Sequence, residues 1–141
     1  YEGEPYVIEL AARLSGGYFC THEIPLNTGV NFVKQAILLA LGEHINLSEL
    51  TPLYNRGVAQ RYIFPPPGRI VRISGVDCVK KRSDIAMCEI RVIEGGIIKQ
   101  YDSHPARAGV VIAGGATRQD AIANAEWAIK KIEIETKPLD S

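Results

Sequence analysis

The chain has 141 residues and a mass of 15.4 kDa, which fits one compact domain or two small lobes that share a core. Hydrophobic residues make up 46% and charged residues 23%, so the composition excludes long disordered or fibrous segments. The 16 basic and 16 acidic residues balance, so no positive field exists to attract nucleic acid or an anionic membrane surface.

The cysteines and the ends of the chain indicate the setting of the protein. Cys20, Cys78 and Cys88 lack the paired spacing of a zinc site or a thioredoxin-like centre, which predicts free thiols in a reducing, cytoplasmic compartment. The longest strongly apolar stretch, residues 36–41, is far shorter than the roughly 20 residues of a membrane-spanning helix. The sequence opens on Tyr1 without a basic and apolar leader, so we expect a piece of a longer polypeptide.

Residues 6–14 carry the pattern of a strand with one face in a core. Their even positions are apolar or aromatic, while Glu9 and Arg13 fall on the other face. The strand should end at Gly16-Gly17, and residues 18–28 are predicted to form a loop.

A buried helix is predicted for residues 30–41, whose apolar side chains recur at helical spacing. Thr28 is positioned to cap its start, and Gly42 suits the position just past its end. Residues 43–57 carry a weaker helix-or-turn pattern and should join two lobes.

The second half of the chain predicts a small mixed or antiparallel sheet. Strands are expected at 60–64, 69–74, 87–93, 97–101 and 108–113. The turn Glu94-Gly95-Gly96 is typical of a hairpin between the third and fourth strands, and three prolines at 65–67 interrupt pairing after the first.

Thr117 and Asp120 form a capping-box pattern before a helix that should lie on this sheet. The apolar stripe of the helix consists of Ala121, Ile122, Ala125, Ala128, Ile129 and Ile132. A short strand should begin near residue 133. We therefore predict an α+β fold with two parts, residues 1–55 and 56–141.

Glu9 and Arg13 are candidate site residues. On a regular strand they would lie about 13 Å apart on one face, too far to neutralise each other. A carboxylate can hold a divalent cation, and a guanidinium farther along can hold an anion that bridges toward it, as phosphates with magnesium do. Two solvated charges on an exposed strand face are the alternative.

Several segments together resemble a known family. Val7 to Gly17 with its Ile-Glu-x-Ala-Ala-Arg pattern, the loop Thr21 to Gly29 and the helix ending in Leu39-Ala40-Leu41-Gly42-Glu43 resemble the last catalytic strand and adjoining helix of ATP-grasp ligases. Phe64-Pro65-Pro66-Pro67-Gly68-Arg69-Ile70 and Arg107 to Ala121 resemble the C-terminal lobe that follows in those ligases. Within that superfamily the chain most resembles carboxylate-amine ligases of the L-amino acid ligase type.

The resemblance implies roles for individual residues. Glu9 would coordinate the Mg²⁺ that bridges the phosphates of ATP. Arg13, as a catalytic residue that also contacts the cofactor, would steady the acyl phosphate or the tetrahedral intermediate. Gly16 and Gly17 would bring backbone amides to a substrate carboxylate, although a tight turn alone also selects glycine. His22 would face the acceptor substrate, with an ordinary loop position as the alternative. The partners implied are an upstream nucleotide-binding part of the same polypeptide and small carboxylate and amine substrates; the oligomeric state stays open.

Two other functions remain as alternatives. Carbamoyl-phosphate-synthase-like and biotin-carboxylase-like enzymes use bicarbonate, and many ATP-grasp enzymes place a metal-binding asparagine two residues after the glutamate. Ala11 stands there, which disfavours bicarbonate chemistry and implies a further acidic ligand upstream of Tyr1. The third reading is a non-catalytic binding or assembly module. The Gly114-Gly115 turn could be a phosphate-binding loop or a simple turn and helix cap, and the missing glycine spacing favours the latter.

Overall fold

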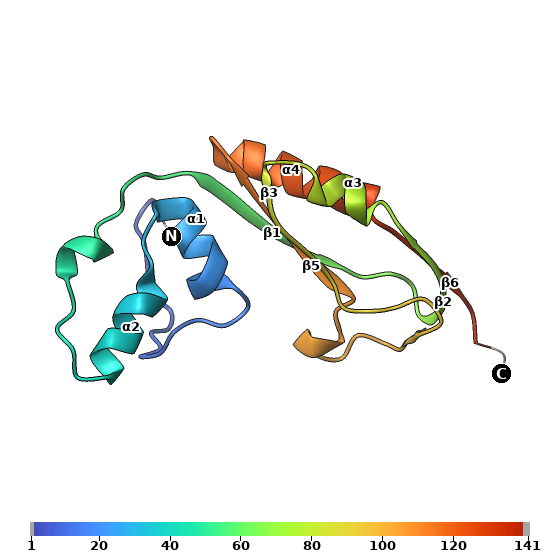
Figure 1. The fold of residues 1–141 in the computed structure, drawn as a ribbon, viewed down its shortest axis with the longest axis horizontal. Coiled ribbons are helices and arrows are strands. Elements are labelled where there is room, and N and C mark those ends of the chain that lie inside the picture. Colours follow the sequence, from blue (N-terminus) through green and yellow to red (C-terminus); the bar gives the residue numbers. More distant parts are fainter. Residues whose placement is uncertain (1, 140–141) are drawn as a thin grey trace.

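The computed structural model describes residues 2–139 and confirms the predicted α+β fold. Short helices make up the N-terminal part, and the C-terminal part contains two small sheets and a long helix (Figure 1). Strand β1 begins at Gly57, just after the predicted division between residues 55 and 56; that division stays a prediction.

The C-terminal part consists of two antiparallel three-stranded sheets. The first has the order β1-β5-β3, formed by Gly57–Ile63, Gly109–Gly115 and Ile85–Ile90. The second has the order β4-β2-β6, formed by Ile97–Ile98, Gly68–Ser74 and Glu133–Lys137. The strand expected over 97–101 is thus reduced to two residues, while the other strands predicted after residue 57 are confirmed with shifted ends.

The predicted hairpin at Glu94-Gly95-Gly96 is wrong. Gly96 closes a tight turn by donating to the Ile93 carbonyl, but the strands on either side of the turn belong to different sheets. The Gly95 amide instead donates to the Ile70 carbonyl of β2 at 2.8 Å. The turn therefore carries the chain from one sheet to the other.

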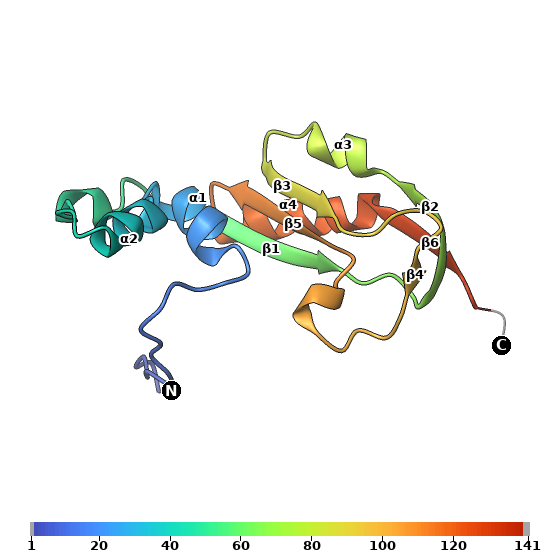
Figure 2. The same ribbon diagram turned by 60° about the horizontal axis from the view of Figure 1, so that its bottom comes forward.

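Helix α4, Arg118–Lys131, packs against β1 and β5 as predicted (Figure 2). Its capping box is formed: the Thr117 side chain accepts from the Asp120 amide, and the Asp120 carboxylate accepts from the Thr117 amide. Three alanines of the predicted stripe are fully buried against the sheet, at 121, 125 and 128. Val111 and Ala113 of β5 belong to the same core, because alternate residues of a strand share a face.

Glycine is required where the short helix α3, Val76–Lys80, meets the end of α4. Gly75 has φ +81°, and a Cβ there would lie 1.8 Å from the carbonyl oxygen of Lys131. The left-handed backbone favours glycine, and the close approach leaves no space for any side chain. This contact fixes α3 against the core.

The N-terminal part contains helices where a loop was predicted. Residues 18–28 form the π-helical turn η1, Phe19–Glu23, and the helix α1, Ile24–Thr28, which ends at Gly29 with φ +78°. Pro25 occupies the first turn of α1, where a missing amide costs nothing, so the turn-forming residues that suggested a loop instead mark the ends of a short helix.

The predicted helix over residues 30–41 forms as α2, Phe32–Ala40, but its burial is not as predicted. Ile37 and Leu39, which are two positions apart and therefore lie on different sides of the helix, are 55% and 63% exposed. Asn31 caps the start in place of Thr28, and Gly42 ends the helix as expected, with φ +77°. A short 3-10 helix, η2 at Leu47–Leu50, follows.

The strand predicted for residues 6–14 does not form. This segment has no regular secondary structure, and Ile8 is 99% exposed. A strand needs a neighbour to pair its amides and carbonyls, and within the described part of the chain no strand pairs with it. The apolar side chains alternate as predicted, but they remain exposed among residues 2–139.

Candidate functional site

Glu9 and Arg13 lie on the irregular N-terminal segment and are both exposed. The Arg13 guanidinium donates to the carbonyl of its neighbour Leu14 at 3.2 Å. Without a regular strand, the shared face predicted for the two side chains is not present in this structure. Their roles stay predictions.

Gly16 and Gly17 take part in a hollow of about 550 Å³, here called the arginine pocket. Its other walls are Tyr18 and Phe19 from the same turn, Tyr62 of β1, Arg91 after β3, and His104, Pro105 and Arg107 around the 3-10 helix η3, His104–Ala106. Gly17 has φ +67°, and a Cβ there would touch the Tyr62 hydroxyl at 3.5 Å. The glycine turn predicted to contact substrate therefore lines a hollow together with Tyr62, Arg91 and Arg107 from distant segments.

Tyr18, Glu89 and Arg91 form one hydrogen-bonded network at the side of this pocket. The Tyr18 hydroxyl donates to the Glu89 carboxylate at 2.7 Å and accepts from the Arg91 guanidinium at 2.6 Å. Arg91 also donates to Glu89 at 3.0 Å. Two hydrogen bonds lower the pKa of the Glu89 carboxyl below its ordinary value. The bond from Tyr18 has the larger effect, and the bond from Arg91 the smaller. Tyr18 has φ +74°, so this network holds a non-glycine residue in a left-handed conformation.

Arg107 is arranged differently from Arg91. Its guanidinium carbon lies 3.7 Å from the centre of the Tyr62 ring, and one of its nitrogens lies 3.4 Å from Nε2 of His104. No carboxylate among residues 2–139 forms an ion pair with it, and none lines the pocket. The pocket therefore contains one cation whose charge is not balanced by a neighbouring acid.

His22, the remaining predicted site residue, lies in the π-helical turn η1 beside the pocket. Its ring packs edge-on against Tyr18 with the centres 5.3 Å apart, and its Nδ1 is hydrogen-bonded to the Thr21 hydroxyl. The next residue, Glu23, has a buried Oε1 without a hydrogen-bond partner in the described chain, and burial raises the pKa of its carboxyl. The turn η1 therefore supports Tyr18 in the pocket wall through His22, and it buries part of the Glu23 carboxylate.

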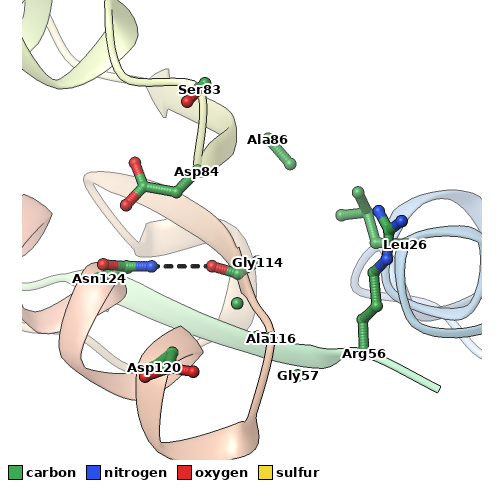
Figure 3. A pocket seen from close by; sticks show the side chains of 11 residues that line it. Leu26, Arg56, Gly57, Ser83, Asp84, Ala86, Gly114, Ala116, Asp120 and Asn124 are labelled. Carbon is green, nitrogen blue, oxygen red and sulfur yellow. Dashed lines mark hydrogen bonds between the residues drawn. The ribbon is translucent and has the colours of Figure 1, made fainter.

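A second hollow, of about 740 Å³, lies between the start of α4, the start of β3 and the segment before β1 (Figure 3). Three of its polar side chains are engaged in hydrogen bonds or ion pairs within the fold. Asn124 donates to the Gly114 carbonyl at 2.9 Å, Asp84 pairs with Arg82, and Asp120 caps α4. Gly115 is packed so tightly that a Cβ would lie 2.5 Å from the Ala121 amide. This geometry agrees with a turn and helix cap at Gly114-Gly115.

The match to a protein family concerns the C-terminal part of the chain. Residues 61–137, more than half of the chain, match the family described as L-amino acid ligase C-terminal domain 2. The chain belongs to this family. The resemblance to ATP-grasp ligases of the L-amino acid ligase type, drawn from the sequence motifs, is thereby confirmed. No curated protein sequence matches the chain.

Two solved structures share the fold of this ligase domain. The L-amino acid ligase from Bacillus licheniformis superposes on 96% of the chain with a TM-score of 0.74 and 24% identity. The phosphoribosylglycinamide synthetase from Anaerococcus prevotii superposes on 84% with a TM-score of 0.68 and 21% identity. The ligase domain spans 34% and 30% of those two chains, about a third of their length.

The ligase domain forms the arginine pocket from residues that the sequence motifs did not assign to a site. Arg91, Arg107 and Tyr62 belong to three segments, and no local spacing relates them. Arg107 is the first residue of the Arg107 to Ala121 motif. Its position in this motif is the one sequence signal that could have marked it as a site residue. Among residues 2–139, no cluster of His, Cys, Asp and Glu has the form of a metal site, and no helix has the length and apolar composition to cross a membrane.

Proposed function

We propose that the chain is the C-terminal part of an ATP-dependent ligase that joins a carboxylate to an amine. The observation that carries this proposal is the family match over residues 61–137. The shared fold across 96% of the chain supports it, as does the fact that the chain spans about a third of the ligase it superposes on.

The exposed apolar surface supports a larger assembly. Val7, Ile8 and Leu10 are 86–99% exposed, and α2 presents Ile37 and Leu39 to solvent. Leaving each of these side chains in water forgoes about 1.5–3 kcal/mol that its burial would contribute. We infer that the nucleotide-binding part of the same polypeptide covers them, and that residues 6–14 pair there as a strand.

Glu9 is the proposed magnesium ligand. Its exposed carboxylate is a hard oxygen donor of the kind that Mg²⁺ prefers, and it has no ion-pair partner among residues 2–139. No second acid lies with it in a metal-binding cluster of the described residues, so the nucleotide-binding part and the phosphates of ATP would supply the other ligands. Bound magnesium would neutralise phosphate charge during transfer.

Arg13 is proposed to hold the oxyanion. Its planar guanidinium can donate two parallel hydrogen bonds to an acyl phosphate or to the tetrahedral intermediate. Gly16 and Gly17 follow after two residues, and their backbone amides are proposed to meet a substrate carboxylate, with His22 facing the acceptor substrate. These residues contribute positioning and charge stabilisation, which is what this chemistry requires of a protein.

In the proposed reaction, a carboxylate oxygen attacks the terminal phosphorus of ATP and releases ADP. The acyl phosphate formed is then attacked at its carbonyl carbon by a neutral amine. Collapse of the tetrahedral intermediate breaks the bond to phosphate, and the amine nitrogen loses a proton to give the amide.

The test is Glu9→Gln in the complete ligase, with ADP release measured against a panel of amino acids and against bicarbonate. Loss of a metal ligand should lower ATP-dependent turnover by at least about tenfold, since outer partners of such ligands alone account for 10–100-fold. Glu43→Gln, at an exposed position just after α2, is the matched control and should leave turnover unchanged. Unchanged turnover in Glu9→Gln would reject the metal role, and product formation only with bicarbonate would reject the carboxylate-amine assignment.

A further inference from the structure

The network of Tyr18, Glu89 and Arg91 joins the N-terminal turn to the first sheet. Glu89 lies on β3, opposite Val110 of the central strand β5, and the Arg91 amide donates to the Ala108 carbonyl at 2.8 Å. Tyr18 precedes Glu89 by 71 residues and Arg91 by 73. Two side chains that are anchored on the sheet therefore hold a residue of the turn through its hydroxyl group.

The network permits a single arrangement of hydrogen bonds. A guanidinium can only donate and an ionised carboxylate can only accept, so the Tyr18 hydroxyl accepts from Arg91 and donates to Glu89. The bond from Arg91 to Glu89 at 3.0 Å closes the triangle. His22 packs edge-on against the Tyr18 ring, so the ring is held as well as the hydroxyl.

Tyr18 occupies a backbone position that favours glycine. The Phe19 amide donates to the Gly16 carbonyl at 3.4 Å, which makes Gly17 and Tyr18 the central residues of a tight turn. Both have positive φ, +67° and +74°. Glycine adopts this conformation freely, whereas a tyrosine adopts it rarely and keeps it only where its surroundings impose it. The hydrogen bonds of the Tyr18 side chain supply this constraint.

We propose that Glu89 is a positioning residue of the ligase, which acts with Arg91 and through Tyr18 to hold the Gly16-Gly17 turn in the conformation used in the reaction. The role in the reaction rests on the proposed function, in which the amides of this turn meet a substrate carboxylate. Glu89 is not one of the residues that line the arginine pocket, so it acts through Tyr18 and not by contact with a substrate. The sheet of the C-terminal part thereby sets the geometry of a turn that belongs to the N-terminal part.

Nuclear magnetic resonance of the 141-residue chain tests whether Glu89 holds the turn. A strong cross-peak between the amide and Hα protons of Tyr18 reports its positive φ in the folded chain. Glu89→Ala should weaken this cross-peak to the intensity of ordinary backbone, and Glu89→Gln, whose amide oxygen can still accept from Tyr18, should lie in between.

Glu135→Ala is the matched control for this experiment. The Glu135 side chain is 40% exposed, compared with 39% for Glu89, and each is paired with an arginine. Because Glu135 lies on β6 of the second sheet, its replacement should leave the Tyr18 cross-peak unchanged.

Kinetics of the complete ligase test the role in the reaction. Glu89→Ala should lower kcat/KM for the carboxylate and amine substrates by at least about tenfold, because a small displacement of positioning groups costs up to about a hundredfold. The decrease should include a higher KM for the substrate that meets the turn, which a smaller amount of folded enzyme would not produce, while KM for ATP is retained. In a Tyr18→Phe background, Glu89→Ala should lower kcat/KM no further, because both groups act through one hydroxyl.

Three results would each overturn the inference and leave the proposed function standing. They are an unchanged Tyr18 cross-peak in Glu89→Ala, unchanged kinetics of that variant, and the full effect of Glu89→Ala in the absence of the Tyr18 hydroxyl. Thermal unfolding shows that each variant is folded at the assay temperature. If the unmodified ligase releases no ADP in response to a carboxylate and an amine, the proposed function fails, and the Tyr18 cross-peak alone then decides whether Glu89 holds the turn.

Discussion

Tyr18→Phe removes one hydroxyl group that connects the N-terminal turn to β3. Two hydrogen bonds to charged groups pass through this hydroxyl, at 2.7 Å to Glu89 and 2.6 Å from Arg91. Such bonds contribute about 1.5–3 kcal/mol each when buried, and exposure to solvent reduces this, so we expect a combined loss of about 1–2 kcal/mol. For a chain of this length Tm falls about 3 °C per kcal/mol, which predicts a decrease of about 3–6 °C at pH 7.

The same substitution should change the dependence of stability on acid pH. The pKa of Glu89 is lowered in the folded chain, so its contribution is fully present above the ordinary glutamate pKa of 4.5 and is lost as pH falls through the folded value. The difference in Tm between the parent chain and Tyr18→Phe should therefore be constant from pH 7 to pH 5 and shrink below about pH 4.

Tyr54→Phe is the matched control. Its hydroxyl donates to the uncharged Pro25 carbonyl at 3.2 Å on the surface, so Tm should change by less than about 2 °C at every pH. Calorimetry or circular dichroism across the pH series measures both variants. Identical Tm values for the parent and Tyr18→Phe at pH 7, or a difference that does not shrink in acid, would refute the role given to the network.

Two further pairs of substitutions test the packing. Gly75→Ala adds a Cβ that would lie 1.8 Å from the Lys131 carbonyl oxygen, and it should lower the free energy of unfolding by more than about 3 kcal/mol. Gly95→Ala, with φ +83° and open space around it, should lower it by about 1 kcal/mol in the same denaturant experiment. Equal losses would mean that the steric contact at Gly75 is unimportant. Ala125→Leu overpacks α4 against the sheet and should lower the free energy of unfolding by about 1–3 kcal/mol. Ala123→Leu, on the exposed face of the helix, should change it by less than about 0.5 kcal/mol. An unchanged stability of Ala125→Leu would show that α4 is loosely packed.

The C-terminal part could be predicted from sequence because its signals are local. The capping box of Thr117 and Asp120 defines where α4 begins, and the small side chains at 121, 125 and 128 identify its inner face. The arrangement of the strands could not be predicted in this way. Glu94-Gly95-Gly96 is a turn in any context, and only the pairing of β3 with β5 determines that it does not close a hairpin.

The N-terminal part shows a different limit of sequence reasoning. The alternation over residues 6–14 and the apolar face of α2 report that these segments suit burial, not which surface buries them. The site depends even more on tertiary structure. Gly16 and Gly17 can be noticed in the sequence as a glycine pair. The unbalanced charge of Arg107 and its stacking on Tyr62 depend on residues from distant segments. Such relations between distant residues have no spacing that a pattern can detect.

The pairing of the strands has a consequence for how the protein is made. β1 ends at Ile63 but its partner β5 begins at Gly109, and β2 pairs along its length with β6, which begins at Glu133. Neither sheet can close while the ribosome is still synthesising the middle of the chain, so the first two strands emerge with open edges. Loop closure over such separations slows folding, and nascent chains of this domain should depend on chaperones that shield those edges until translation reaches the last strand.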